Sequence, residues 1–76
     1  MNKARRKRIA KIHEKLEELL TEIEEVRDEE QEAYDNMPES LQESERGNEM
    51  SEAIENLDSA YNSVEEAMEY MEEYVE

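Results

Sequence analysis

Apolar residues recur along the first half of the chain at alternating spacings of three and four. The residues that keep this spacing are Ile9, Ile12, Leu16, Leu19, Ile23 and Val26. On an α-helix such a pattern places an apolar side chain on one side at every turn, with the alternation of a coiled-coil seam. It predicts a helix over about residues 4–35 that packs through those residues.

The second half of the chain keeps the same alternation and adds a third apolar position in each heptad. Its seam residues are Met50, Ala53, Leu57, Ala60, Val64, Ala67, Met71 and Tyr74. The pattern predicts a second helix over about residues 48–75, with Asn48 at its N-cap. Since one neighbouring helix covers only one stripe, the additional residues Ile54, Tyr61 and Met68 are predicted to face a second copy or a protein partner.

The segment between the two predicted helices contains the only proline and the only glycine of the chain, Pro38 and Gly47. Proline prevents a smooth continuation of the first helix, because its ring excludes the α conformation for the preceding residue. We therefore expect a turn over residues 36–47 within one all-α domain covering residues 1–76. The expected architecture is an antiparallel two-helix hairpin, which either stands alone or dimerises into a four-helix bundle. The turn is longer than most helix–helix connections, so it is either a plain connector or a recognition surface.

With 76 residues and no cysteine, the chain is expected to have a thin core without support from disulfides or a structural zinc. The basic start is not followed by seven or more consecutive apolar residues, as a signal peptide requires. No segment is apolar enough to cross a bilayer. These features favour a cytoplasmic protein without membrane contact.

Charge is strongly segregated along the sequence. Residues 1–15 carry seven Lys and Arg against one Glu, whereas residues 16–76 carry 23 Asp and Glu against two Arg. In an antiparallel hairpin the basic arm, defined as residues 3–15, lies beside residues 65–76, so the two segments form an intramolecular charge clamp in one interpretation. In the other, the arm binds nucleic acid, although the net charge of −21 on the remaining residues opposes this. The residues for that contact are Arg5, Arg6, Arg8 and Lys11.

The acidic part of the chain suggests a binding surface. On a hairpin about 45 Å long, 21 net charges correspond to about one per 2 Å, close to one per ~1.7 Å in duplex DNA. This density is compatible with mimicry of a nucleic acid toward a cationic protein, and the alternative is a solvated acidic face that confers solubility. The predicted partner-binding residues, near the end of the second helix, are Glu65, Glu66, Glu69, Tyr70, Glu72 and Glu73.

The residue types and spacings do not indicate catalysis. The carboxylates are predicted to be exposed, so burial does not shift their pKa values toward general acid–base work. The single histidine, His13, lacks the Glu three residues before it that di-metal helical bundles use, and Gly47 stands alone rather than in a phosphate-binding loop. We expect a protein that is not an enzyme and has no catalytic, cofactor-binding or metal site.

The run EEQEAYDNMPESLQESERGNEM, followed by SEAIENLDSAYNSVEEAMEYMEEYVE, resembles small acidic helical proteins encoded by phages and mobile elements of Gram-positive bacteria. The resemblance covers most of the chain and is most specific in residues 36–42 and 44–47. It implies a phage-type origin and a location in the host cytoplasm, and it carries no settled activity. Small phage proteins of this charge are often inhibitors of host enzymes or defence systems.

Three functions are therefore expected as alternatives. The first is an inhibitor of a host nucleic-acid-handling or defence protein, acting through the acidic helical surface with nucleic-acid mimicry as one route. The second is a structural homodimer or adaptor that forms a four-helix bundle. The third is a nucleic-acid binder that uses the basic arm, as in the small hairpin dimers of plasmid copy control.

Overall fold

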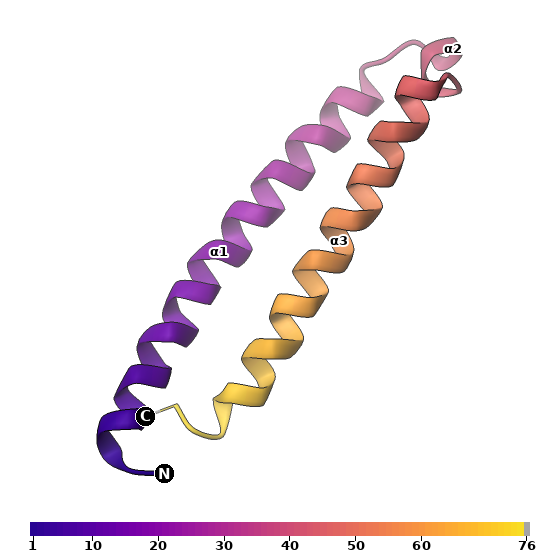
Figure 1. Ribbon diagram of the computed structural model, residues 1–76. Helices are drawn as coiled ribbons and strands as arrows, with labels where there is room; N and C mark the ends of the chain where they lie inside the picture. The colour runs from indigo at the N-terminus through magenta and orange to yellow at the C-terminus, as the bar shows by residue number, and fades with distance from the viewer. Residues whose placement is uncertain (76) are drawn as a thin grey trace.

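The computed structural model describes residues 1–75 and shows a helical hairpin, as predicted (Figure 1). Helix α1 covers Lys3–Asp35, the short helix α2 covers Glu39–Gln42, and helix α3 covers Glu45–Glu72. The start of α1 and the end of α3 lie together at the end of the hairpin opposite α2. The molecule measures 58 × 15 × 12 Å. Its radius of gyration of 17.2 Å exceeds the roughly 11 Å of a compact globule of this length, so the hairpin is a thin rod.

Helix α1 agrees with the predicted range of residues 4–35 to within one residue at its start. Asn2 is its N-cap, and the Asn2 Oδ1 atom accepts a hydrogen bond of 2.8 Å from the backbone N–H of Arg5. This bond satisfies one of the donors left free at a helix start. The helix ends at Asp35, before the proline that interrupts the backbone pattern.

The connection between the long helices is shorter than predicted. Helix α3 begins at Glu45, three residues before the predicted start, so Asn48 lies inside the helix and the predicted N-cap was wrong. Ser44 is the N-cap, and its side-chain oxygen accepts a hydrogen bond of 3.3 Å from the N–H of Gly47. Both Ser44 and Asn48 suit an N-cap by residue type. The close approach of α2 to α3 selects the earlier one.

One side chain of α2, Gln42, contacts the end of α1. The Gln42 amide donates hydrogen bonds of 2.9 Å to the Tyr34 carbonyl oxygen and 3.2 Å to the Met37 carbonyl oxygen. Carbonyl groups at a helix end have no partner within the helix, so the part-buried Gln42 stabilises the turn by pairing with them.

The core is a single line of side chains between α1 and α3. Among residues 1–75, the buried hydrophobic residues are Leu20, Ile54 and Met68, with 8%, 7% and 7% of their surface exposed. None of the described large side chains is fully enclosed. Two helices can shield only one stripe each, which is why a hairpin of this size has a thin core.

The rotation of α1 about its axis differs from the prediction. Leu20 faces α3 directly, with Leu16 and Ile23 half-buried beside it. The predicted seam residues Ile12, Leu19 and Val26 are instead 47%, 49% and 52% exposed.

Helix α3 is rotated in the corresponding way. Ile54 and Met68 are buried against α1 and Tyr61 is half-buried, so the prediction that they form an outward apolar face was wrong. Of the predicted α3 seam, Ala60, Ala67 and Tyr74 are exposed. Both helices thus leave part of their apolar surface uncovered.

Candidate interaction surfaces

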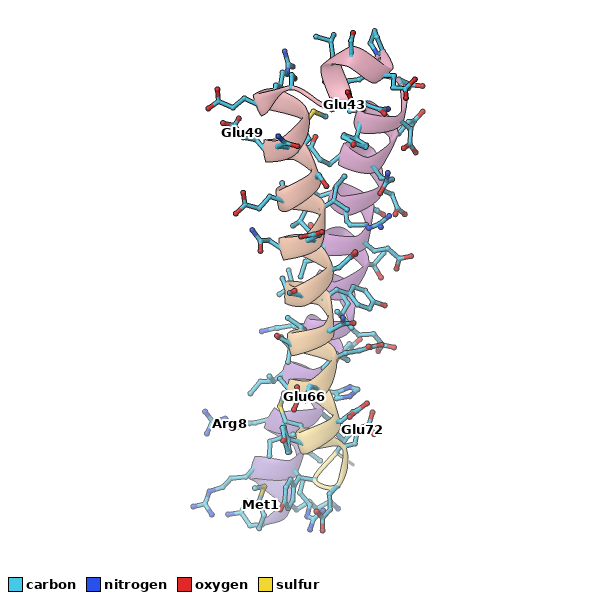
Figure 2. The ribbon with its side chains drawn as sticks, turned by 90° about the vertical axis from the view of Figure 1, so that its right-hand side faces the viewer. Met1, Arg8, Glu43, Glu49, Glu66 and Glu72 are labelled. Atoms are coloured by element: carbon cyan, nitrogen blue, oxygen red, sulfur yellow. The ribbon has the colours of Figure 1, made fainter. Side chains whose placement is uncertain are left out.

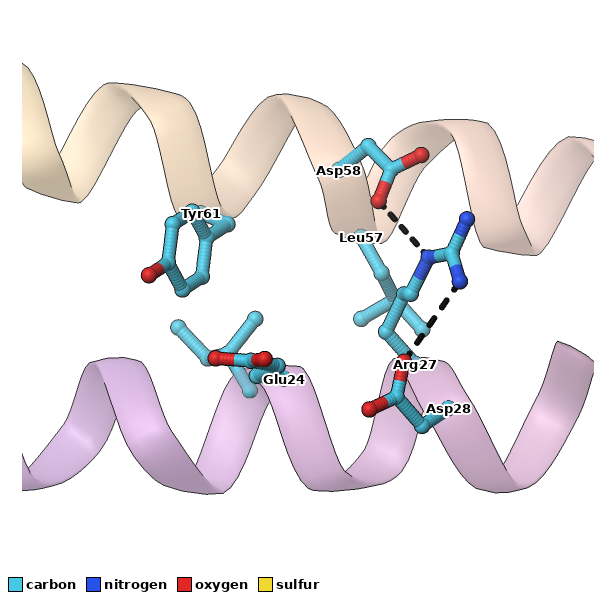
Figure 3. Close-up of a pocket in the computed structure, with 7 residues that line it drawn as sticks. Glu24, Arg27, Asp28, Leu57, Asp58 and Tyr61 are labelled. Atoms are coloured by element: carbon cyan, nitrogen blue, oxygen red, sulfur yellow. Dashed lines mark hydrogen bonds and ion pairs between the residues drawn. The ribbon is translucent and has the colours of Figure 1, made fainter.

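One side of the hairpin carries two grooves between the long helices, at different levels along the rod. The groove in Figure 3 is lined by Ile23, Glu24, Arg27, Asp28, Leu57, Asp58 and Tyr61. A second groove lies nearer the chain ends and is lined by His13, Glu17, Leu20, Thr21, Tyr61, Glu65, Met68, Glu69 and Glu72. We call this the polar side of the hairpin.

Arg27 links the two long helices across the polar side (Figure 3). Its Nε–H donates a hydrogen bond of 2.8 Å to Asp58 Oδ1, and its Nη1 lies 3.5 Å from Asp28 Oδ1. The hydrogen bond to Asp58 raises the pKa of Arg27 above its ordinary value, with a further contribution from the charges of Asp58 and Asp28. The guanidinium is already engaged, so this cluster fixes the helix register instead of offering a free cation to a ligand.

His13 also faces α3 instead of solvent. Its Nε2 atom lies 3.9 Å from Glu72 Oε1, and within residues 1–75 it has no hydrogen-bond partner. His13 and Arg27 show that α1 places polar residues at positions directed toward its neighbour.

The predicted partner-binding residues lie together near the end of α3. Every one of them is exposed, and Figure 2 shows Glu66 and Glu72 on this part of the hairpin: Glu65, Glu66, Glu69, Tyr70, Glu72 and Glu73. We call this set the acidic–tyrosine surface. Tyr70 is 74% exposed, and its hydroxyl donates a hydrogen bond of 3.4 Å to Glu66 Oε1. Packing within the hairpin therefore does not account for this aromatic side chain.

The basic arm lies at the start of α1, beside the end of α3. Arg5, Arg8 and Lys11 are exposed and Arg6 is half-buried. Arg8 extends away from the hairpin, on the opposite side from Glu72 (Figure 2). Within residues 1–75, the Lys and Arg ion pairs are those of Arg27 with Asp28 and Asp58, and His13 lies 3.9 Å from Glu72. The predicted charge clamp thus has no Lys or Arg ion pair in this range, and Glu76, which belongs to that prediction, lies outside the described residues.

A surface that the sequence interpretation missed lies opposite the polar side. It consists of apolar residues repeating every seven positions on both helices, which we call the apolar stripe: Ile12, Leu19, Val26 and Ala33 on α1, and Ala53, Ala60, Ala67 and Tyr74 on α3. All are exposed except the half-buried Ala53. The sevenfold repeat was visible in the sequence, but it was assigned to the seam between the helices.

The described residues give no further indication of chemistry. In residues 1–75, no three His, Cys, Asp or Glu side chains converge in a way that would hold a metal ion. None of the described helices is long and apolar enough to cross a membrane.

Comparison with protein-family models, with curated proteins and with solved structures finds no match to the chain. The resemblance to small phage-encoded acidic proteins therefore stays a prediction.

Proposed function

We propose that the chain is a non-enzymatic binding protein whose acidic–tyrosine surface occupies a cationic site on a target protein, as an inhibitor of a host nucleic-acid-handling or defence protein does. The observation that carries the proposal is Tyr70, which is 74% exposed among carboxylates. Tyrosine is enriched at interface hot spots because its ring offers a large contact area and its hydroxyl a polar end.

The carboxylates around Tyr70 favour a cationic partner. Glu66, Glu69 and Glu73 are exposed, and none of them is in an ion pair within residues 1–75. Unpaired charges of one sign steer a cationic protein into contact and raise its association rate.

Charge spacing alone supports nucleic-acid mimicry less than the sequence suggested. The hairpin is 58 Å long, so the net charge of −21 on residues 16–76 corresponds to about one charge per 3 Å. Duplex DNA carries one per ~1.7 Å. The proposal therefore rests on the tyrosine and its carboxylates together, with mimicry as one route.

A capture experiment tests this proposal. The immobilised wild-type protein, Tyr70→Ala and the matched control Thr21→Ala are each exposed to an extract of a Gram-positive bacterium, and retained proteins are eluted with a salt gradient. We expect the wild type and the control to retain a target protein that elutes as the salt concentration rises. For Tyr70→Ala we expect roughly 30-fold weaker retention, as for a hot spot of about 2 kcal/mol. Light scattering on each variant verifies that the substitution leaves the association state unchanged. Retention that survives Tyr70→Ala or high salt contradicts the proposal.

The basic arm supports a second candidate function, binding of nucleic acid. Its Lys and Arg side chains form no ion pair within residues 1–75, so their charges are available to phosphates. With about four phosphate contacts, affinity for duplex DNA should fall roughly a hundredfold between about 50 and 200 mM salt. Gel retardation of RNA and DNA by the wild type and by Arg5→Ser/Arg8→Ser measures this. Absence of retardation at about 50 mM salt removes the candidate.

A further inference from the structure

The apolar stripe is a regular row of apolar side chains that the folded hairpin leaves exposed. Ile12, Leu19 and Val26 are about half exposed, at 47%, 49% and 52%. On α3, Ala60 and Ala67 are exposed in the same sevenfold repeat. The net charge of −15 accounts for solubility, but it does not explain a row of exposed apolar residues. Exposed apolar patches mark interaction sites.

Both halves of the stripe lie on one side of the molecule. Glu17, Glu24, Asp58 and Glu65 each come directly after a seam residue, so they lie on the same flank of their helices. Glu24 and Asp58 line one groove, and Glu17 and Glu65 line the other, which places these flanks together on the polar side. In an antiparallel pair the opposite flanks of the two helices then also meet on a single side. Consistent with this, Ala33 comes directly before the inward-facing Tyr34 and Arg46 directly before Gly47, and both line one groove with Met50.

Charge is low along this side of α3. The positions that border the stripe there, again seven residues apart, are Asn56, Ser63 and Tyr70. Helix α3 otherwise presents carboxylates on its outer surface, as Figure 2 shows for Glu66 and Glu72. From residue 56 to residue 70, the apolar row of α3 therefore has an uncharged border, as expected of a surface that packs against another.

The stripe is complementary to itself under a twofold rotation. The contacts of Arg27 with Asp58 and of His13 with Glu72 show which residues of α1 and α3 lie at the same level. The midpoint of the stripe on α1 falls between residues 22 and 23. By this register it lies level with residue 63 of α3, the midpoint of the stripe there, to within about one residue. A twofold axis at this level places α1 on α1 and α3 on α3 of the second copy. Two pairs then join a larger residue to a smaller one, Ile12 with Ala33 and Tyr74 with Ala53. In the middle of the stripe Leu19 meets Val26, and Ala60 meets Ala67.

The distribution of charge along the rod selects the orientation. The loop half, residues 23–63, has 14 Asp and Glu against two Arg and a net charge of −12. The terminal half, residues 1–22 and 64–75, has nine Glu against seven Lys and Arg and a net charge of −2. Placing both loops at one end would bring the two −12 halves together, whereas the antiparallel orientation places each −12 half on a −2 half.

The antiparallel orientation also supplies the basic arm with a partner. The same twofold axis brings the α1 residues 10–15 of one copy level with residues 30–35 of the other. The first segment contains Lys11 and Lys15 with one Glu, and the second contains Glu30, Glu32 and Asp35 and no Lys or Arg. Opposite charges therefore lie at the same level of the two copies.

From these observations we propose that a second copy of this chain covers the apolar stripe, forming an antiparallel four-helix bundle with the loops at opposite ends. The occupant is the chain itself, because one surface provides the large residues, the small residues and both signs of charge. Such a contact is isologous and closes at two copies.

Light scattering coupled to size exclusion tests the association. The wild type should have twice the monomer mass of 9.1 kDa, and its melting temperature should rise with protein concentration. Leu19→Glu should give the monomer mass. Thr21→Glu adds the same charge on the polar side and should remain a dimer. Circular dichroism verifies that Leu19→Glu keeps its helices. A wild-type monomer with a concentration-independent melting temperature, or a dimeric Leu19→Glu, overturns the proposal.

Disulfide mapping tests the orientation, since the chain has no cysteine of its own. In Ile12→Cys/Ala33→Cys the two thiols are about 30 Å apart along one helix and cannot join within a chain. The antiparallel bundle predicts a covalent dimer on oxidation, with position 12 of one copy bonded to position 33 of the other. A link between identical positions, or no link in a non-covalent dimer, contradicts the antiparallel arrangement.

Discussion

At the scale of single residues, the junction between α2 and α3 depends on Gly47. A Cβ atom at this position would lie 2.6 Å from the Leu41 carbonyl oxygen and closer still to that of Gln42. These are backbone atoms, so they cannot move aside as a flexible side chain does. The glycine is needed for this close approach of backbone to backbone and not for an unusual dihedral angle, since no described glycine has a positive φ.

Gly47→Ala should therefore destabilise the hairpin although alanine is the better helix former. The overlap with α2 should cost about 1–3 kcal/mol, more than the helix propensity gained. Thermal unfolding followed by circular dichroism measures the loss, and Ser59→Ala, at an exposed position of α3, should change stability by less than about 0.5 kcal/mol. Equal stability of Gly47→Ala and the wild type would mean that α2 does not pack against α3 in solution.

At the scale of the helices, α1 presents a mixed seam. Leu20 is buried, but His13 and Arg27 face α3 along the same row while Ile12, Leu19 and Val26 face outward. A polar residue in a seam lowers stability and fixes register, because it has a partner in only one alignment. The 2.8 Å hydrogen bond from Arg27 to Asp58 is such a partner.

Truncations on the two rows should distinguish the seam from the stripe. Ile54→Ala removes a buried side chain and should cost about 2–4 kcal/mol. Val26→Ala removes a half-exposed one and should cost less than about 0.5 kcal/mol in the monomer. Chemical denaturation at low protein concentration compares them, and a cost of Val26→Ala that grows with concentration would measure the stripe as an interface. A larger cost for Val26→Ala than for Ile54→Ala in the dilute monomer would contradict the observed helix rotation.

At the scale of the whole molecule, charge and shape act together. A rod 58 Å long with net charge −15 separates its charges over several Debye lengths of ~8 Å, so its two halves interact with a partner almost independently. The loop half is strongly acidic, and the terminal half combines the basic arm with the acidic–tyrosine surface. Glu66, Glu69 and Glu73 belong neither to the stripe nor to the row that borders it, so a dimer formed through the stripe leaves these carboxylates open to a target protein.

Much of the fold follows from local sequence. The repeat of apolar residues defined two long helices, and Pro38 placed the interruption between them. The exposed position of the carboxylates near the end of α3 also followed, because charged side chains between apolar rows face solvent: Glu65, Glu66, Glu69, Glu72 and Glu73. The start of α3 did not follow, since Ser44 and Asn48 are both suitable caps and only the approach of α2 distinguishes them.

The sequence by itself determined that this chain forms two amphipathic helices, with a basic start and an acidic remainder. Tertiary structure alone decided which apolar row each helix turns toward the other. With three apolar positions per heptad, α3 has two possible seams that share one row, and local propensity is the same for both. In α1 the second possible row mixes Leu20 with His13 and Arg27. The choice depends on what meets across the hairpin, such as Arg27 with Asp58, and Leu20 and Met68, which line the same groove. These contacts arise only when both helices are present, and they leave the remaining apolar row exposed on the surface.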